Sequence, residues 1–280
     1  MSKLSVPALE SSLTTRISMR WGPETPFETT DTLVITVGEW YVDLRVDKQS
    51  GKLDWALAGE CLQEDTSTRS VVFTHEIDSH HNFNISNPCP FIPLPNGDDL
   101  ETGTMARRDI PGAPMTDYEE VWRYLPFREG PEAPGHSLSW ILESDEGVLE
   151  EGQHQVTKVF LAQIGGSYLV LHQKQIHVVG QTPLRGRGVQ ITGEDVSARR
   201  EEWADGHWEV KYALGPGYDG LPSMANGLDV EMRGRKSGEK VTIGGCDFIV
   251  RAYAAHAPRK ARVRQVLDTI APTGLLPGRK

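Results

Sequence analysis

Apolar and polar side chains alternate with a period of two along much of this chain, and this pattern constrains its fold more than any other feature. The stretch EWYVDLRV, for example, sends two sets of side chains to opposite faces: Trp40, Val42, Leu44 and Val46 against Tyr41, Asp43 and Arg45. Such alternation is typical of strands with two unlike faces. It recurs in KLDWALAG, RSVVFTHEI, HQVTKVFLAQI and SYLVLHQKQIHVVG, so the sequence predicts an all-β fold.

Turn-forming residues divide these segments into a series of hairpins. The 280 residues include 28 Gly and 18 Pro, which interrupt the alternating pattern repeatedly. A chain of this length and pattern is expected to form two antiparallel barrels or sandwiches. We place the N-terminal domain at residues 12–146 and the C-terminal domain at residues 153–255, because the segment between them, DEGVLEEGQ, is acidic and contains glycine.

Two segments depart from the strand pattern and are expected to be helical. In TDYEEVWRYL, Thr116 is placed to cap a short internal helix, and Glu119 three residues later completes a capping box. The tail from residue 256 to 280 has six Lys or Arg and one Asp, and its segment PRKARVRQVLDTIA predicts a basic helix. That helix is either a solvated terminal element or a docking element for an acidic surface.

Composition excludes several classes of protein. The net charge of −10 argues against nucleic acid as the main partner. No apolar run approaches the roughly 20 residues that cross a bilayer, and the first residues lack the apolar core of a secretion signal. Three cysteines, odd in number and far apart, form neither a disulfide framework nor a zinc ribbon. We therefore expect a cytoplasmic protein without a membrane span.

A cluster of histidines and acids lies in VVFTHEIDSHHNF. His75 and His81 are roughly 20 Å apart along an extended strand, and Glu76, Asp78 and His80 follow one another at intervals of roughly 7 Å. These separations are too wide for a shared ion, so we predict no metal site. His75 shares its face with apolar side chains, which predicts an inward position. There it is either a hydrogen-bonded core residue or an acid in a ligand pocket.

Several short motifs resemble one protein family. YVDLR, DWALAG, HEIDS, LETGTM and YEEVWR occur here in the order seen in the fungal HRI-type proteins, and VSARREEW and LPS resemble the C-terminal half of that family. The resemblance covers most of residues 12–255 and implies two calycin (lipocalin-like) barrels. The sequence departs from ordinary relatives at Glu76, where they have tryptophan, and in the strand VLHQKQIHVVGQ.

The resemblance also implies a possible activity without a cofactor. Some specialised fungal relatives are hetero-Diels–Alderases of secondary metabolism, which join a tropolone-derived o-quinone methide to a humulene-type sesquiterpene. If this chain is such a pericyclase, its partners are small hydrophobic substrates, a tropolone and a polyene terpene. The family name, taken from a yeast protein that interacts with a casein kinase, implies instead a protein partner, which the basic tail could bind.

Candidate residues for this chemistry come from the inner faces of the expected barrel. Four aromatic side chains are candidates for the substrate-binding walls: Trp40, Trp55, Phe73 and Trp122. His75 or Tyr118 would donate the proton that assists loss of water, and Arg45 would donate a hydrogen bond to the ketone oxygen. Arg45 reaches the lumen only if its face, shared with Asp43, is the inner one; otherwise it forms a structural ion pair.

Plainer interpretations remain beside these roles. The tryptophans could be ordinary barrel core, and the helix containing Tyr118 and Trp122 could plug one end of the barrel. The alternative function is a non-catalytic calycin that binds a lipophilic ligand or a protein partner. A metal-dependent isomerase or hydrolase built on the histidine cluster is the third and weakest hypothesis.

Overall fold

The computed structural model of the chain describes residues 11–65, 69–83, 86–132, 136–147, 149–179 and 189–256. Within these ranges the backbone forms seventeen β-strands and one short 3₁₀ helix, η1 (Tyr218–Gly220), which confirms the all-β prediction. No helix of the described part has the length and apolar character needed to span a membrane. The basic helix predicted for the tail lies outside the described residues, which end at residue 256.

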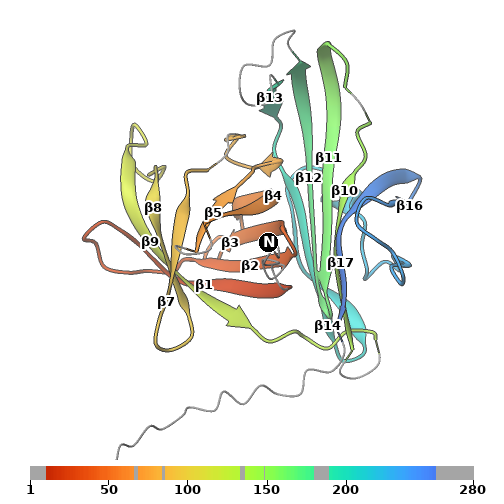
Figure 1. Cartoon of the computed structure of the whole chain (residues 1–280), viewed down its shortest axis with the longest axis horizontal. Coiled ribbons are helices and arrows are strands. Elements are labelled where there is room, and N and C mark those ends of the chain that lie inside the picture. Colours follow the sequence, from red (N-terminus) through yellow and green to blue (C-terminus); the bar gives the residue numbers. More distant parts are fainter. Residues whose placement is uncertain are drawn as a thin grey trace, which may run out of the picture.

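The N-terminal half forms a closed eight-stranded barrel (Figure 1). Apart from the short β6, each strand pairs with its neighbours in sequence, and β3 with β4 and β1 with β9 complete the ring. This up-and-down closure leaves no free edge in the ring, which is the arrangement of lipocalin-like barrels. The strands are β1 (Ser12–Trp21), β2 (Thr30–Val37), β3 (Trp40–Asp47), β4 (Leu53–Asp65), β5 (Ser70–Phe73), β6 (Ile77–Asp78), β7 (Cys89–Pro93), β8 (Asp99–Ala106) and β9 (Met115–Leu125).

The short internal helix predicted over TDYEEVWRYL is wrong, because this segment is strand β9. Its buried side chains are Tyr118, Glu120 and Trp122, which follow a period of two. Aromatic and β-branched residues suit a pleated sheet, and β9 pairs along its length with β1 and β8. This tertiary pairing outweighs the local capping signal at Thr116.

The C-terminal half forms a second antiparallel sheet of eight strands. Its main order is β15-β14-β12-β11-β10-β17-β16, with β13 alongside β12. The edge strands β15 and β16 do not pair with each other in the described part of the chain, so this sheet is not closed as the barrel is. The strands are β10 (Ser137–Ser144), β11 (Gly152–Ile164), β12 (Ser167–Val179), β13 (Val189–Gly193), β14 (Ser197–Ala204), β15 (His207–Leu214), β16 (Lys240–Ile243) and β17 (Cys246–His256).

The change from one sheet to the other falls earlier than the boundary expected after residue 146. Strand β10 already pairs with β11 and β17, so the connection between the sheets is the segment 126–136. The second sheet has its own apolar layer on the face away from the barrel. There Leu221, Met224 and Met232, from the segment between β15 and β16, pack against residues such as Trp140 and Tyr168.

The barrel and the second sheet pack face to face through a shared apolar layer (Figure 1). From the barrel this layer includes Val42, Leu44 and Val46 of β3, and from the second sheet Phe160 and Leu169. The apolar face of β3 is therefore the outer face of the barrel, covered by the second sheet. The opposite face of β3, which carries Asp43 and Arg45, is turned into the barrel.

Candidate functional site

The barrel encloses a cavity of about 750 Å³. Its volume lies within the range of pockets that bind small organic molecules. One side is aromatic and apolar, with Trp55 and Leu57 of β4, Phe73 of β5 and Phe91 of β7. The rings of Phe73 and Phe91 meet edge to face, with centroids 6.5 Å apart. This side offers a flat apolar surface for a hydrocarbon or an aromatic ring.

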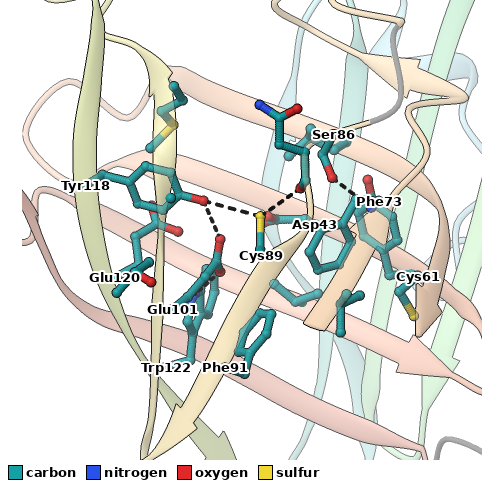
Figure 2. A pocket seen from close by; sticks show the side chains of 18 of the residues that line it. Asp43, Cys61, Phe73, Ser86, Cys89, Phe91, Glu101, Tyr118, Glu120 and Trp122 are labelled. Atoms are coloured by element: carbon teal, nitrogen blue, oxygen red, sulfur yellow. Dashed lines mark hydrogen bonds between the residues drawn. The ribbon is translucent and has the colours of Figure 1, made fainter. Parts of the chain in front are cut away.

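The other side of the cavity carries a pair of buried glutamates (Figure 2). Glu101 of β8 and Glu120 of β9 are directly opposite residues in the antiparallel pairing, so their side chains lie on the same inner face. Tyr118 Oη donates a hydrogen bond to Glu101 Oε1 at 2.6 Å, and Trp122 Nε1 donates to Glu101 Oε2 at 2.9 Å. The Glu101 carboxyl group thus has one like charge, Glu120, and two hydrogen-bond donors beside it.

The surroundings of Glu101 raise its pKa to about 7. Burial is the largest cause, since Glu101 is only 7% exposed, and the negative charge of Glu120 is the next. The hydrogen bonds from Tyr118 and Trp122 and the charge of Arg45 act in the opposite direction. Glu101 is therefore a carboxyl group that both holds and releases a proton near neutral pH, which is what general acid catalysis requires.

Arg45 of β3 forms ion pairs with two carboxylates of the cavity, one on β3 itself and one on β9. Its Nε and Nη2 donate to Asp43 Oδ2 at 3.0 and 2.9 Å, and its Nη1 donates to Glu120 Oε1 at 3.1 Å. The guanidinium also lies over the rings of Trp55 and Trp122, 4.8 and 5.2 Å from their centroids. Burial lowers the pKa of Arg45, but its two carboxylate neighbours outweigh this and raise it above the ordinary value, so Arg45 is a permanent cation.

Tyr118 is a hydrogen-bond donor in this cavity and a poor acid. Burial, together with the charge of Glu101, raises the pKa of its phenol well above the usual value. Its oxygen also lies 3.6 Å from Cys89 Sγ, and that thiol donates to the carbonyl of Asn87 (Figure 2). Burial raises the pKa of the Cys89 thiol to about 11 and that of the Cys61 thiol to about 12, so neither thiol is an activated nucleophile.

His75 lines the cavity and is oriented by Asp78. His75 Nδ1 lies 2.9 Å from Asp78 Oδ2, and Asp78 Oδ1 accepts a hydrogen bond from Trp55 Nε1 at 3.0 Å. The second sheet holds this segment in place, since Gln173 Nε2 donates to the carbonyl of Asp78 at 3.0 Å. His80 stacks on the Trp55 ring. Among the described residues no group of three or more His, Cys, Asp or Glu side chains is arranged to hold a metal ion.

The cavity brings together six of the seven predicted site residues: Arg45, Trp55, Phe73, His75, Tyr118 and Trp122. The seventh, Trp40, is not part of the lining. It packs on the opposite side of β3 against the layer between the sheets, stacked on Phe160 with centroids 6.0 Å apart. Trp40 shares its face with Val42 and Leu44, and that face is the outer one.

The sequence reasoning missed Glu101 and Glu120. The sequence contained a signal for both glutamates. Tyr118, Glu120 and Trp122 occupy alternate positions, as inward side chains of a strand do, and Glu101 lies in the motif LETGTM. Treating residues 116–125 as a helix placed these side chains on different faces. Treated as a strand, the same residues share one face, and a paired strand then brings Glu101 opposite Glu120.

Gly103 gives the Tyr118 ring the space it needs beside Glu101. Gly103 pairs with Tyr118 across β8 and β9, and a Cβ at this position would lie 2.8 Å from both Cε1 and Oη of the ring. We expect Gly103→Ala to displace the ring, weaken its hydrogen bond to Glu101 and lower the free energy of unfolding by about 1–3 kcal/mol. Urea denaturation would measure this. In a Tyr118→Ala background the methyl group has room, so an equal loss there would contradict the explanation.

A closed eight-stranded barrel around an interior cavity, with an aromatic wall and a buried acid, defines the class of up-and-down β-barrels with an enclosed pocket. The family model described as Protein HRI1 matches residues 12–250, and the chain belongs to this family. The resemblance to HRI-type proteins is thereby confirmed.

One solved structure has a similar fold. It is the crystal structure of an uncharacterized protein from Saccharomyces cerevisiae, with a TM-score of 0.61 and 18% sequence identity. The similar region covers 88% of this chain and 100% of the yeast chain. At this identity the likeness shows the fold alone. No curated protein matches the sequence.

Proposed function

We propose that the barrel cavity is the active site of a cofactor-independent pericyclase, a hetero-Diels–Alderase of fungal secondary metabolism. Its substrates would be a hydroxymethyl tropolone, which gives an o-quinone methide, and a humulene-type sesquiterpene. The observation that carries the proposal is the position of Glu101, a carboxyl group with a pKa of about 7 in a cavity that also has an aromatic wall. The cavity therefore offers a proton donor and a surface for a polyene together.

In the first step Glu101 would assist the loss of water. Protonated Glu101 gives its proton to the hydroxyl of the hydroxymethyl group, the C–O bond breaks with its electron pair on oxygen, and water leaves. The ring hydroxyl then loses its proton, which returns to Glu101, and its electrons form the ring carbonyl of the neutral o-quinone methide. Arg45 uses three of its five N–H groups on Asp43 and Glu120, so two remain for that carbonyl oxygen.

In the second step the quinone methide and one double bond of the terpene form two new bonds without any proton transfer. Catalysis of such a step needs two reactants held in register, and this orientation can be worth about 7–11 kcal/mol. Trp55, Phe73 and Phe91 form the wall against which the polyene would lie. The enzyme would thereby select one face and one double bond.

The proposal is tested by incubating the purified protein with a hydroxymethyl tropolone and humulene. We expect faster formation of the adduct and one predominant stereoisomer, where the enzyme-free reaction gives a mixture. Heat-denatured protein is the control. Product ratios equal to those of the enzyme-free reaction would exclude this function.

A second candidate is a non-catalytic barrel that binds a lipophilic ligand or a protein partner. It is favoured by the pairing of buried charges with one another, since Arg45 pairs with Asp43 and Glu120, and Glu120 also pairs with Arg16, in a network that is useful for stability. Under this alternative a probe would bind the cavity with saturation, and the protein would leave the adduct ratio unchanged.

A further inference from the structure

Among the side chains that line the cavity, one fully buried oxygen atom has no hydrogen-bond partner in the described part of the chain. It is Oδ1 of Asp43, a residue only 4% exposed that lines the cavity. The other oxygen, Oδ2, accepts two hydrogen bonds from Arg45. A buried carboxylate oxygen without a partner is costly, unless a molecule in the cavity donates a hydrogen bond to it.

The remaining charges of the cavity show what kind of molecule that is. Its lining contains two guanidinium groups, and each already pairs with carboxylates: Arg45 with Asp43 and Glu120, and Arg69 with Asp99 at 3.2 Å. No arginine or lysine of the lining is therefore left without a carboxylate partner to receive a carboxylate or phosphate of a ligand. The lining has four carboxyl groups and two guanidinium groups. Even with Glu101 protonated, whose pKa is about 7, three carboxyl groups stand against two cations, and this excess of negative charge disfavours an anion.

We propose that the cavity selects a neutral or cationic ligand with a hydrogen-bond donor, a hydroxyl or an amine, and that Asp43 Oδ1 is the acceptor that recognises this donor. This inference rests on the proposed function in one respect, that the cavity receives a small molecule. It adds the chemical class of that molecule and a specificity-determining residue. It also excludes fatty acids and other carboxylates as the preferred ligands.

The substitution Asp43→Asn tests the role of this oxygen. Asparagine keeps the shape of the side chain, and its single carbonyl oxygen can continue to accept the hydrogen bonds from Arg45. Its Nδ2 then takes the place of Oδ1 and presents a donor to the cavity. The acceptor is thereby exchanged for a donor, and the ligand preference should change with it.

Three probes of matched size separate the possibilities: 2-naphthol, 2-methoxynaphthalene and 2-naphthoate, each measured by equilibrium dialysis at pH 7. The full-length protein should bind 2-naphthol roughly 10- to 100-fold more tightly than the methyl ether, as expected for a hydrogen bond to a charged acceptor, and bind 2-naphthoate most weakly. Asp43→Asn should lose or reverse the preference for the naphthol.

Asp99→Asn is the matched control, because Asp99 lines the same cavity but both of its oxygens have partners in Arg69 and Tyr124. This variant should keep the preference for 2-naphthol. If Asp43→Asn does not fold, the three-probe comparison on the unmodified protein still decides the ligand class. Circular dichroism of each variant shows whether the fold is intact.

The outcomes separate this inference from the proposed catalysis. Equal affinity for 2-naphthol and its methyl ether, or tightest binding of 2-naphthoate, would overturn the inference and say nothing against a cycloaddition. A clear preference for 2-naphthol that depends on Asp43, with an unchanged adduct ratio, would support the inference and exclude the pericyclase. No saturable binding of any probe would overturn the inference, and the adduct assay would still decide the pericyclase on its own substrates.

Discussion

Replacing Arg45 with methionine should lower the free energy of unfolding by about 3–5 kcal/mol, the usual effect of removing one partner from a buried ion pair. Arg45 is the cation between Asp43 and Glu120, and all three side chains are buried. Methionine would occupy similar space but would leave both carboxylates without this partner. The contacts of the guanidinium with Trp55 and Trp122 would be lost as well.

Urea denaturation at pH 7 measures this effect, and Arg20→Met is its matched control. Arg20 also pairs with a glutamate of β9, Glu119, but both side chains are more than one third exposed. An exposed pair of this kind contributes little to stability, because solvent screens its charges. A loss below about 1 kcal/mol for Arg45→Met, or equal losses for the two variants, would show that the cavity charges are not desolvated as the structure indicates.

Replacing Glu101 with glutamine should slow the loss of water from a hydroxymethyl tropolone by roughly 10²- to 10⁴-fold, the usual contribution of a general acid. The variant keeps the cavity, because the amide oxygen can accept from Trp122 Nε1 and the amide nitrogen can donate to Tyr118 Oη. The rate is measured by following substrate loss under single-turnover conditions. An undiminished rate in this variant would remove Glu101 from the proposed mechanism.

The pH dependence of the rate distinguishes an acid from a residue that only supports the cavity. The rate should fall as pH rises through about 7, because Glu101 then loses the proton that it donates. Tyr118→Phe removes a hydrogen bond that lowers the pKa of Glu101, so the fall should move to higher pH. A profile that keeps its midpoint in Tyr118→Phe would contradict this assignment.

The raised pKa of Glu101 also predicts how stability depends on pH. An acidic group with a lowered pKa adds stability as pH rises, whereas Glu101 should remove it. Between the ordinary value of 4.5 and about 7, native Glu101 holds a proton that the unfolded chain has released. Stability therefore falls as pH rises through this interval, by roughly 3 kcal/mol for this group. Glu101→Gln lacks this fall, so the variant should gain that much relative to the unmodified protein between pH 4 and pH 8.

Much of the fold could be predicted from local patterns, because the alternation of apolar and polar side chains in a strand is visible in its own sequence. Phe73 and His75 were expected inside the barrel, and the structure places both in the cavity lining. The error over residues 116–125 has a different origin. A capping signal acts within one turn of chain, whereas the pairing of β9 with β1 depends on residues far away in sequence.

The sequence by itself determined most of the strands, with β9 as an exception, and the sets of side chains that share a face, because a strand alternates its side chains whatever surrounds it. Only the tertiary structure decided which face is the interior. On β3 the apolar face with Val42 and Leu44 turns outward because the second sheet covers it, and the polar face with Asp43 and Arg45 turns inward. The ion pair of Arg45 with Glu120 and the burial that raises the pKa of Glu101 follow from that choice, because each depends on side chains that come together only inside the closed barrel.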